Sequence, residues 1–469
     1  MSDFTLVDPR GWEYDLQSVY SAYMSHFQFH NILWYEKTWG HLFETFNLFL
    51  GCSWPVIIVT DTWTSKAHIV TKLSHIQSFI KMIRTRFGET LPLLDNFLKI
   101  TPYETSTRPL RTISDMLAYR KAHSTLSGAA LVSLKTRIRA GEPKFIQQLW
   151  NSREKTFLAI DFEWSERNAS SCLEWGYAAV RCNNLDVLGI WPPDPNENYR
   201  RGHYVVQEYT NVQNKHCPTF PWEYAFGSTQ VIPKVKLPMI IQAVISSLSS
   251  PDSDTRANDL VIVAHGAHGD IKRMVEMGIK LPSNVHVIDT ASFERELFSG
   301  GHRGPMVDSY GKPRALKAII SLPAALASLG VDARWSFHNS GNDAFSSLLA
   351  LQMLIDRDNT KAPIPAIPRR GRNAEVNTLR TRSWSPGPMS IPIPTQNSLP
   401  VVSVYGISDV SMNTSSPSRG TAGNHLTPND FGSARRTSSR PNTFYGIGTN
   451  NRNSSMGDLL SSMQNLRTT

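Results

Sequence analysis

The chain of 469 residues has little cysteine and no long apolar run, and both shortages exclude classes of protein. Its four cysteines show no CxxC spacing, which gives no zinc signature and fits a reduced intracellular protein. The most apolar window, residues 42–59, is broken by Glu44, Asn47, Gly51 and Pro55, so it predicts buried core rather than a membrane span. The first residues lack a basic stretch before an apolar core, so we expect no secretory signal. These features predict an intracellular protein, cytoplasmic or nuclear, without a membrane partner.

Net charge is also scarce outside the C-terminal part of the chain. Residues 361–469 hold 12 Lys and Arg against 4 Asp and Glu, so they carry +8 of the net charge of +9. The same stretch holds 11 of the 29 prolines and is rich in Ser, Thr and Asn, a composition that buries too little apolar surface to fold. We therefore predict that residues 359–469 form a basic, disordered tail that can attract nucleic acid or another polyanion.

Residues 1–153 are predicted to be a mainly helical region. Aromatic residues within 14–50 recur three or four apart, the spacing of one helical face, and we interpret them as core. Residues 67–87 show apolar residues at helical spacing and predict one amphipathic helix. The β-branched run at 56–59 is compatible with a short strand.

Residues 154–358 change to a mixture of strands and helices. Three predicted strands follow one another, and later strands alternate with helices, which indicates an α/β sheet that is antiparallel first and parallel afterwards. Helices are expected to flank this sheet, including 315–329 and a last one at 344–357 that Ser340 can cap. The predicted strands are 156–160, 173–181, 203–209, 259–264 and 285–288.

The segment KTFLAIDFEW at 155–164 places two acids after an apolar strand. Because side chains alternate along a strand, Asp161 and Glu163 point the same way, roughly 6–7 Å apart along the chain. Two carboxylates on one face repel each other, and a divalent cation with oxygen ligands resolves that repulsion. The alternative is a strand that simply runs out into an acidic loop.

Three residues further along favour the metal interpretation. Asp270 follows an apolar strand at the start of a helix, and His338 and Asp343 lie five apart where the last helix begins. Such positions meet at one edge of an α/β sheet. Four acids there suit Mg²⁺ or Mn²⁺, and two such ions about 4 Å apart can clamp the oxygens of a phosphodiester. A histidine with a pKa near neutrality can take a proton from the attacking water.

These motifs resemble the DEDDh signature of ribonuclease-H-like 3′–5′ exonucleases. The runs DFEWSE at 161–166, AHGAHGD at 264–270 and HNSGND at 338–343 resemble a fungal branch more closely. That branch includes the exonuclease that interacts with the quelling Argonaute protein and yeast proteins linked to mRNA export. The resemblance implies a ribonuclease-H-like fold over 154–358, an RNA substrate and, by analogy, an Argonaute-type silencing partner.

Carried over to this sequence, the resemblance implies roles for the five residues. Asp161, Glu163 and Asp343 would hold a first metal ion, Asp161 and Asp270 a second, and His338 would act as general base. Trp164-Ser165 stand where DNA-type members have Thr-Gly, so contact with the substrate end should differ. Gly266 and Gly269 in the second motif predict a looser loop. Candidates for stacking or phosphate contact are Phe162, Trp164, Arg200, Arg201 and Lys272.

Two hypotheses for function remain at this point. The first is a metal-dependent 3′–5′ exonuclease that hydrolyses RNA or single-stranded nucleic acid with two ions. The second is an exonuclease-like binding module of RNA silencing or mRNA metabolism that has little or no turnover. The intact set of five residues favours the enzyme.

Overall fold

The computed structural model describes residues 5–168, 170–307, 311–365 and 385–386. The predicted basic tail lies, from residue 366 on, outside the described residues except for that last pair. Among the described residues, no helix is long and apolar enough to cross a membrane.

The first 153 residues hold an antiparallel four-stranded sheet in addition to the predicted helices. Its strand order is β2-β4-β3-β6. The strands are β2 (Trp12–Asp15), β4 (Ala67–Lys72), β3 (Trp54–Thr60) and β6 (Arg111–Ile113), and a separate pair joins β1 (Leu6–Val7) to β5 (Arg108–Pro109). The helices are α1 (Leu16–Phe29), α2 (Phe46–Leu50), α3 (Leu73–Phe87), α4 (Met116–His123), α5 (Leu126–Ala140) and α6 (Pro143–Asn151).

The single helix predicted over residues 67–87 is wrong in its first third. Residues 67–72 form β4, which pairs with β2 on one side and β3 on the other, and the helix begins only at Leu73. The run Ile69-Val70-Thr71 is β-branched, and such side chains favour a strand that packs on both sides. The helix then ends at Gly88, which adopts the left-handed conformation.

Most of the aromatic residues predicted as core lie in the core of this region, but Phe29 and Tyr35 are 82% and 63% exposed. Tyr23, Phe27, Phe43 and Phe49 are fully buried and contact one another edge to face or tilted, and Phe79 of α3 packs among them. Such aromatic pairs add stability beyond the area that they bury. The stripe is therefore packing and not a ligand site.

The second sheet has six strands in the order β10-β9-β8-β7-β11-β12. Strands β7, β8 and β9 are antiparallel neighbours, and β11 and β12 continue the sheet in parallel, which confirms the predicted α/β architecture. A sixth strand, β10, was not predicted and pairs in parallel with β9. The bounds are β7 (Thr156–Trp164), β8 (Cys172–Arg181), β9 (Arg200–Val206), β10 (Thr229–Ile232), β11 (Leu260–Ala264) and β12 (His286–Asp289).

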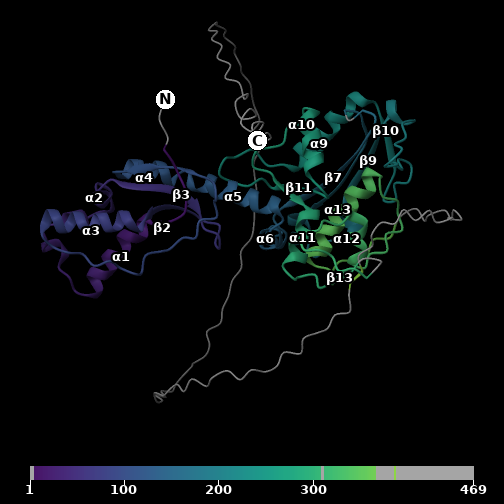
Figure 1. Cartoon of the computed structure of the whole chain (residues 1–469). Helices are drawn as coiled ribbons and strands as arrows, with labels where there is room; N and C mark the ends of the chain where they lie inside the picture. Colours follow the sequence, from purple (N-terminus) through teal and green to yellow (C-terminus); the bar gives the residue numbers. More distant parts are fainter. Residues whose placement is uncertain (1–4, 169, 308–310, 366–384, 387–469) are drawn as a thin grey trace, which may run out of the picture. The chain divides into compact units, whose positions relative to one another are not determined.

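Helices cover both faces of this sheet, as Figure 1 shows. One apolar cluster joins Phe157 and Ala159 of β7 to α13 (Ser340–Ile355), together with α6, α11 (Thr290–Ser299) and α12 (Leu322–Ser328). The other joins Leu158 and Ile160 to α9 (Leu237–Leu248) and α10 (His268–Glu276). The alternation continues along β7, so Asp161 and Glu163 lie on the α13 face.

Two predictions for the last helices are corrected. Helix α12 covers only Leu322–Ser328 of the predicted 315–329, because Ser321 caps it and Pro323 stands in its first turn. The residue that caps α13 is Asn339, whose side chain accepts from the Asn342 N–H, rather than Ser340. Shorter elements are α7 (Cys182–Val187), α8 (Pro195–Asn198), β13 (Met306–Val307) and β14 (Ser385–Pro386).

Candidate metal centre and active site

Strand β7 carries the first two acids within its length rather than beyond its end. Asp161 is paired with Gly176 of β8, and Glu163 with Glu174. The backbone of both acids is therefore fixed by the ladder, and their side chains lie on the face that α13 covers. A rigid strand holds ligands with more precision than a loop.

The beginning of α13 brings the third acid and the histidine. Asp343 is buried in the first turn, and its Oδ2 accepts the backbone N–H of His338 at 2.8 Å. His338 is exposed and has a φ of 61°, a left-handed conformation that is uncommon for residues other than glycine. Ligand atoms of Glu163, His338 and Asp343 all lie within 4.8 Å of one another.

A pair of glycines allows this close approach. A Cβ at Gly176 would lie 2.2 Å from the Ser340 carbonyl oxygen, and one at Gly341 would lie 2.8 Å from the Cβ of His203. Only glycine leaves room for the start of α13 to rest on β8. The placement of Asp343 beside Glu163 therefore depends on residues that have no side chain.

Asp270 follows β11, the strand that pairs with β7 on the edge opposite β8. It is the third residue of α10, after Gly266, whose φ of 86° requires the freedom of glycine. Gly269 is part of the helix, so the second motif is ordered here rather than loose as predicted. The charge of Asp270 acts on both Asp161 and Glu163, which places it within electrostatic reach of them.

The electrostatics of the four acids favour a bound cation. Burial, and then the charges of Asp343 and Asp270, raise the pKa of Asp161 well above its usual value. Burial raises the pKa of Glu163 to about 9, that of Asp343 to about 8 and that of Asp270 to about 7. Without a cation, such buried neighbouring acids keep protons near neutral pH. A divalent ion can replace these protons, because its charge offsets the repulsion between the carboxylates.

The hydrogen bonding of the site tests whether such an ion fits. Asp343 Oδ1 is buried and accepts no hydrogen bond from the described residues, and the same holds for Glu174 Oε1. A buried carboxylate oxygen without a donor is costly unless a cation or water satisfies it. The donor set, all oxygen with one histidine beside it, suits a hard cation such as Mg²⁺ or Mn²⁺.

The third acid of the first motif has a different task. The carboxylate of Glu166 accepts three successive backbone N–H groups, from Lys215, His216 and Cys217, at 2.8, 2.9 and 2.5 Å. These bonds lower its pKa. The clamped loop places the Sγ of Cys217 3.4 Å from Nδ1 of His338. Glu166 therefore shapes the entrance beside His338 instead of joining the acid cluster.

Two functional candidates were missed from the sequence, Glu174 and His203. Both are buried, and Glu174 Oε2 lies 3.0 Å from His203 Nε2. The available signal was a single acid inside the otherwise apolar strand LEWGYAAV. A buried charge in a strand that is covered on both faces requires a partner, and the next strand supplies it.

The residues predicted to contact substrate do not gather at the acid cluster. Phe162 is buried in the core and stacks on Trp164 at 5.4 Å, and Arg273 lies over the Trp164 ring at 4.9 Å. The half-buried Trp164 ring thus contacts both of these neighbours, and the buried Phe162 offers no free face for a base. Arg201 bonds the carbonyl groups of Pro195 and Asn196.

The remaining two predicted contacts are solvent-exposed cations. Arg200 begins β9, and Lys272 pairs weakly with Glu276 along α10 at 3.9 Å. Neither is brought against the four acids by a described contact. Their predicted role in phosphate contact stays a prediction.

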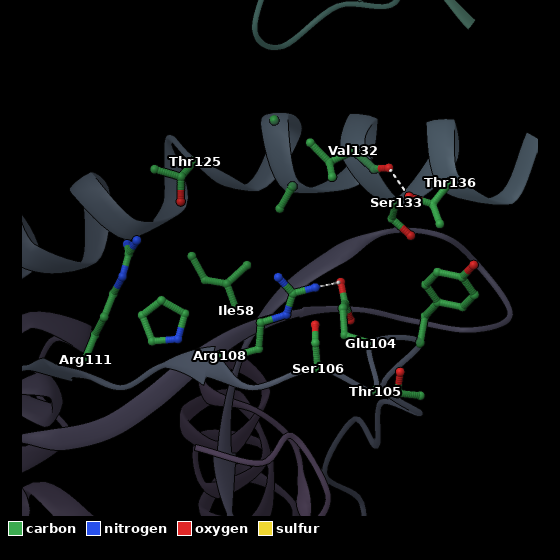
Figure 2. Close-up of a pocket in the computed structure, with 14 residues that line it drawn as sticks. Ile58, Glu104, Thr105, Ser106, Arg108, Arg111, Thr125, Val132, Ser133 and Thr136 are labelled. Atoms are coloured by element: carbon green, nitrogen blue, oxygen red, sulfur yellow. Dashed lines mark hydrogen bonds and ion pairs between the residues drawn. The ribbon is translucent and has the colours of Figure 1, made fainter. Parts of the chain in front are cut away.

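Figure 2 shows a hollow of about 620 Å³ in the N-terminal part of the chain. Strands β5 and β6 provide Arg108 and Arg111, α5 provides Ser133, and Thr125 lies directly before α5. Arg108 points toward Glu104, with which it forms an ion pair at 3.4 Å. None of the predicted site residues, all of which the structure describes, lines this hollow.

Comparison with known proteins supports the resemblance at the level of one domain. Residues 156–354 match the family model described as DNA polymerase III subunit epsilon-like, C-terminal domain, of the DEDDh type. The match begins at the first residue of β7 and ends within α13, so it contains the four acids and His338. This part of the chain is therefore similar to DEDDh exonuclease domains, a family that generally uses divalent metal ions.

A single relative adds a cellular context. An uncharacterized nucleolar protein of Schizosaccharomyces pombe is 27% identical over 230 residues, which cover 48% of this chain and 79% of that protein. The identity is too low to transfer an activity.

Proposed function

We propose that this protein is a metal-dependent 3′–5′ exonuclease that hydrolyses phosphodiester bonds of RNA or other single-stranded nucleic acid. The observation that carries the proposal is the cluster of Glu163, His338 and Asp343, whose ligand atoms lie within 4.8 Å of one another, with Asp161 on the same face of β7. The charge of Asp270, from a third segment of the chain, acts on Asp161 and Glu163. Four acids with raised pKa values and a neighbouring base have no structural task that would require such crowding.

The residues divide the work of hydrolysis between them. Asp161, Glu163 and Asp343 would hold a first divalent ion, and Asp161 with Asp270 a second. When bound, such ions supply positive charge to the oxygens that attack and leave the phosphorus. His338, exposed beside Glu163 and Asp343, takes the proton of the attacking water. The left-handed backbone at His338 directs its ring to this position while its N–H orients Asp343.

Two observations favour the second candidate, a binding module with weak turnover. The Cys217 Sγ lies 3.4 Å from Nδ1 of His338, and Arg273 lies over the half-buried Trp164 ring. Substrate must displace or use this loop to reach His338. The candidate predicts that RNA binds with similar affinity to wild type and to D161A, and that neither shortens it.

The test is digestion in Mg²⁺ by wild type and by D161A. The substrates are a linear RNA and a matched linear DNA, both labelled at the 5′ end, and a circular RNA that has no ends. We expect linear RNA to shorten stepwise from its 3′ end with wild type alone, and circular RNA to stay intact. Trimming that survives D161A, or cleavage of the circle, counts against the proposal.

Two further proposals concern the cellular setting. The relative's name places that protein in the nucleolus, and we propose nuclear residence for this chain on that basis. An Argonaute-type partner is proposed by analogy with the fungal branch, and co-purification with RNase treatment tests it: a partner retained after treatment supports direct contact.

A further inference from the structure

Glu174 is a fifth carboxylate beside the acid cluster. It lies on β8 directly opposite Glu163 on β7 and is 1% exposed. Directly opposed residues of an antiparallel pair point to the same face, with their Cβ atoms roughly 5 Å apart. Glu174 therefore faces α13, on the side of the sheet that holds Asp161 and Asp343.

One oxygen of Glu174 is held by a chain of buried groups. Its Oε2 lies 3.0 Å from His203 Nε2, and His203 Nδ1 lies 3.0 Å from Thr229 Oγ1 on β10. The Thr229 hydroxyl also donates to the Pro221 carbonyl oxygen at 3.3 Å. A hydroxyl has one proton, so His203 Nδ1–H must donate to Thr229, and the contact with the Glu174 carboxylate requires a second proton on Nε2. All these contacts are satisfied together only if both ring nitrogens of His203 are protonated. The ring is then fixed by β10 at one end and meets Glu174 at the other.

The other oxygen of Glu174 has no such partner. Oε1 is buried, and no described group donates to it. The charge of Glu174 contributes to the raised pKa of Asp161, Glu163 and Asp343, so it acts on the cluster directly. In metal sites, carboxylates behind the ligands accept hydrogen bonds from them or from bound water and strengthen the site.

We propose that Glu174 is a positioning residue: His203 and Thr229 hold it so that its free Oε1 accepts a hydrogen bond from water on the divalent cation that Glu163 and Asp343 bind. This contact strengthens the affinity of the cluster for the cation. The inference rests on the proposed metal-dependent function and extends it to a residue outside the five. It also accounts for the buried His203, whose ring has no other contact with the site.

The test is a Mn²⁺ titration of the full chain followed by electron paramagnetic resonance, with wild type, E163Q and E174Q. A matched control is E104Q, because Glu104 is also a largely buried carboxylate, bonded to Thr60 and paired with Arg108, but belongs to the N-terminal region. We expect E174Q to weaken Mn²⁺ binding roughly 10- to 100-fold. E104Q should bind as wild type does.

A purely structural role for Glu174 gives a different pattern. In that case E174Q unfolds at a lower temperature than wild type, but the folded variant binds Mn²⁺ with the wild-type affinity. That result overturns the inference. If E174Q does not fold, the same Mn²⁺ titration is carried out with T229V. That change removes the remote end of the chain of contacts, so weaker Mn²⁺ binding supports the inference and wild-type binding overturns it.

The titration also separates this inference from the proposed function. RNA digestion is a second readout on the same samples. If wild type does not shorten RNA while E163Q and E174Q both weaken Mn²⁺ binding, the proposed exonuclease activity is rejected and the positioning role of Glu174 is kept. If wild type shortens RNA and E174Q binds Mn²⁺ as wild type does, only the positioning role of Glu174 is rejected.

Discussion

The α-carbon of Gly176 lies so close to the backbone of Ser340 that a Cβ there would meet the Ser340 carbonyl oxygen at 2.2 Å. This relationship joins β8, which is paired to the acids of β7, to the beginning of α13, which carries Asp343. This backbone-to-backbone contact thus sets the spacing of the candidate metal ligands on β7 and α13.

Gly176→Ala should destabilise the protein by about 1–3 kcal/mol and weaken divalent-cation binding, because the added methyl group pushes the start of α13 away from β8. Gly269→Ala is the matched control: its Cβ would meet nothing within 4 Å, and it lies within α10. That control should be neutral or stabilise by up to about 1 kcal/mol. Urea unfolding measures both variants, and equal stability of G176A and G269A contradicts the packing argument.

The metal-free protein should lose stability as pH rises. Glu163 and Asp343 have folded-state pKa values of about 9 and 8, far above the ordinary values of 4.5 and 3.8. The folded state therefore binds more protons than the unfolded state between about pH 4 and pH 9, and stability falls across that window. Divalent ions compete with those protons, so stabilisation by Mg²⁺ should grow with pH. Thermal unfolding with EDTA and with Mg²⁺ measures this, and a pH-independent Mg²⁺ effect contradicts it.

Glu166→Ala should release the loop at residues 215–217, because it removes the acceptor of three backbone N–H groups. The Cys217 thiol should then react faster with a thiol reagent, which mass spectrometry of the labelled peptide follows. Asp186→Ala removes an exposed acid paired with Arg153 and serves as control. An unchanged labelling rate in E166A shows that the clamp does not hold the loop.

Modification of Cys217 with a bulky thiol reagent should stop RNA trimming, because its sulfur lies 3.4 Å from His338 Nδ1. C217S should be active and resistant to the reagent although Cys52 remains, a residue that is only partly buried. Inhibition that persists in C217S points to Cys52 or to another site and removes Cys217 from the entrance.

Much of the structure of residues 154–358 follows from local sequence. The apolar run before Asp161 predicts β7, and the positions of Asp270, His338 and Asp343 after strands or before helices predict that they meet. Local patterns are sufficient there because each residue lies at the boundary of a strongly patterned element.

Other features depend on pairing between strands or on conflicting local patterns. Residues 67–72 continue the helical spacing of α3 but hold the β-branched run Ile69-Val70-Thr71, and pairing with two neighbouring strands makes them β4. Glu174 and His203 lie 29 residues apart and meet across β8 and β9. The contact of Arg273 with the Trp164 ring likewise joins different elements, α10 and β7.

The most direct test of the central claim is anomalous diffraction from crystals of the protein soaked in Mn²⁺. We expect two peaks among the carboxylates of Asp161, Glu163, Asp270 and Asp343, and loss of the peak between Asp161, Glu163 and Asp343 in D343N. Manganese peaks elsewhere in the crystal with none among these four acids would contradict it.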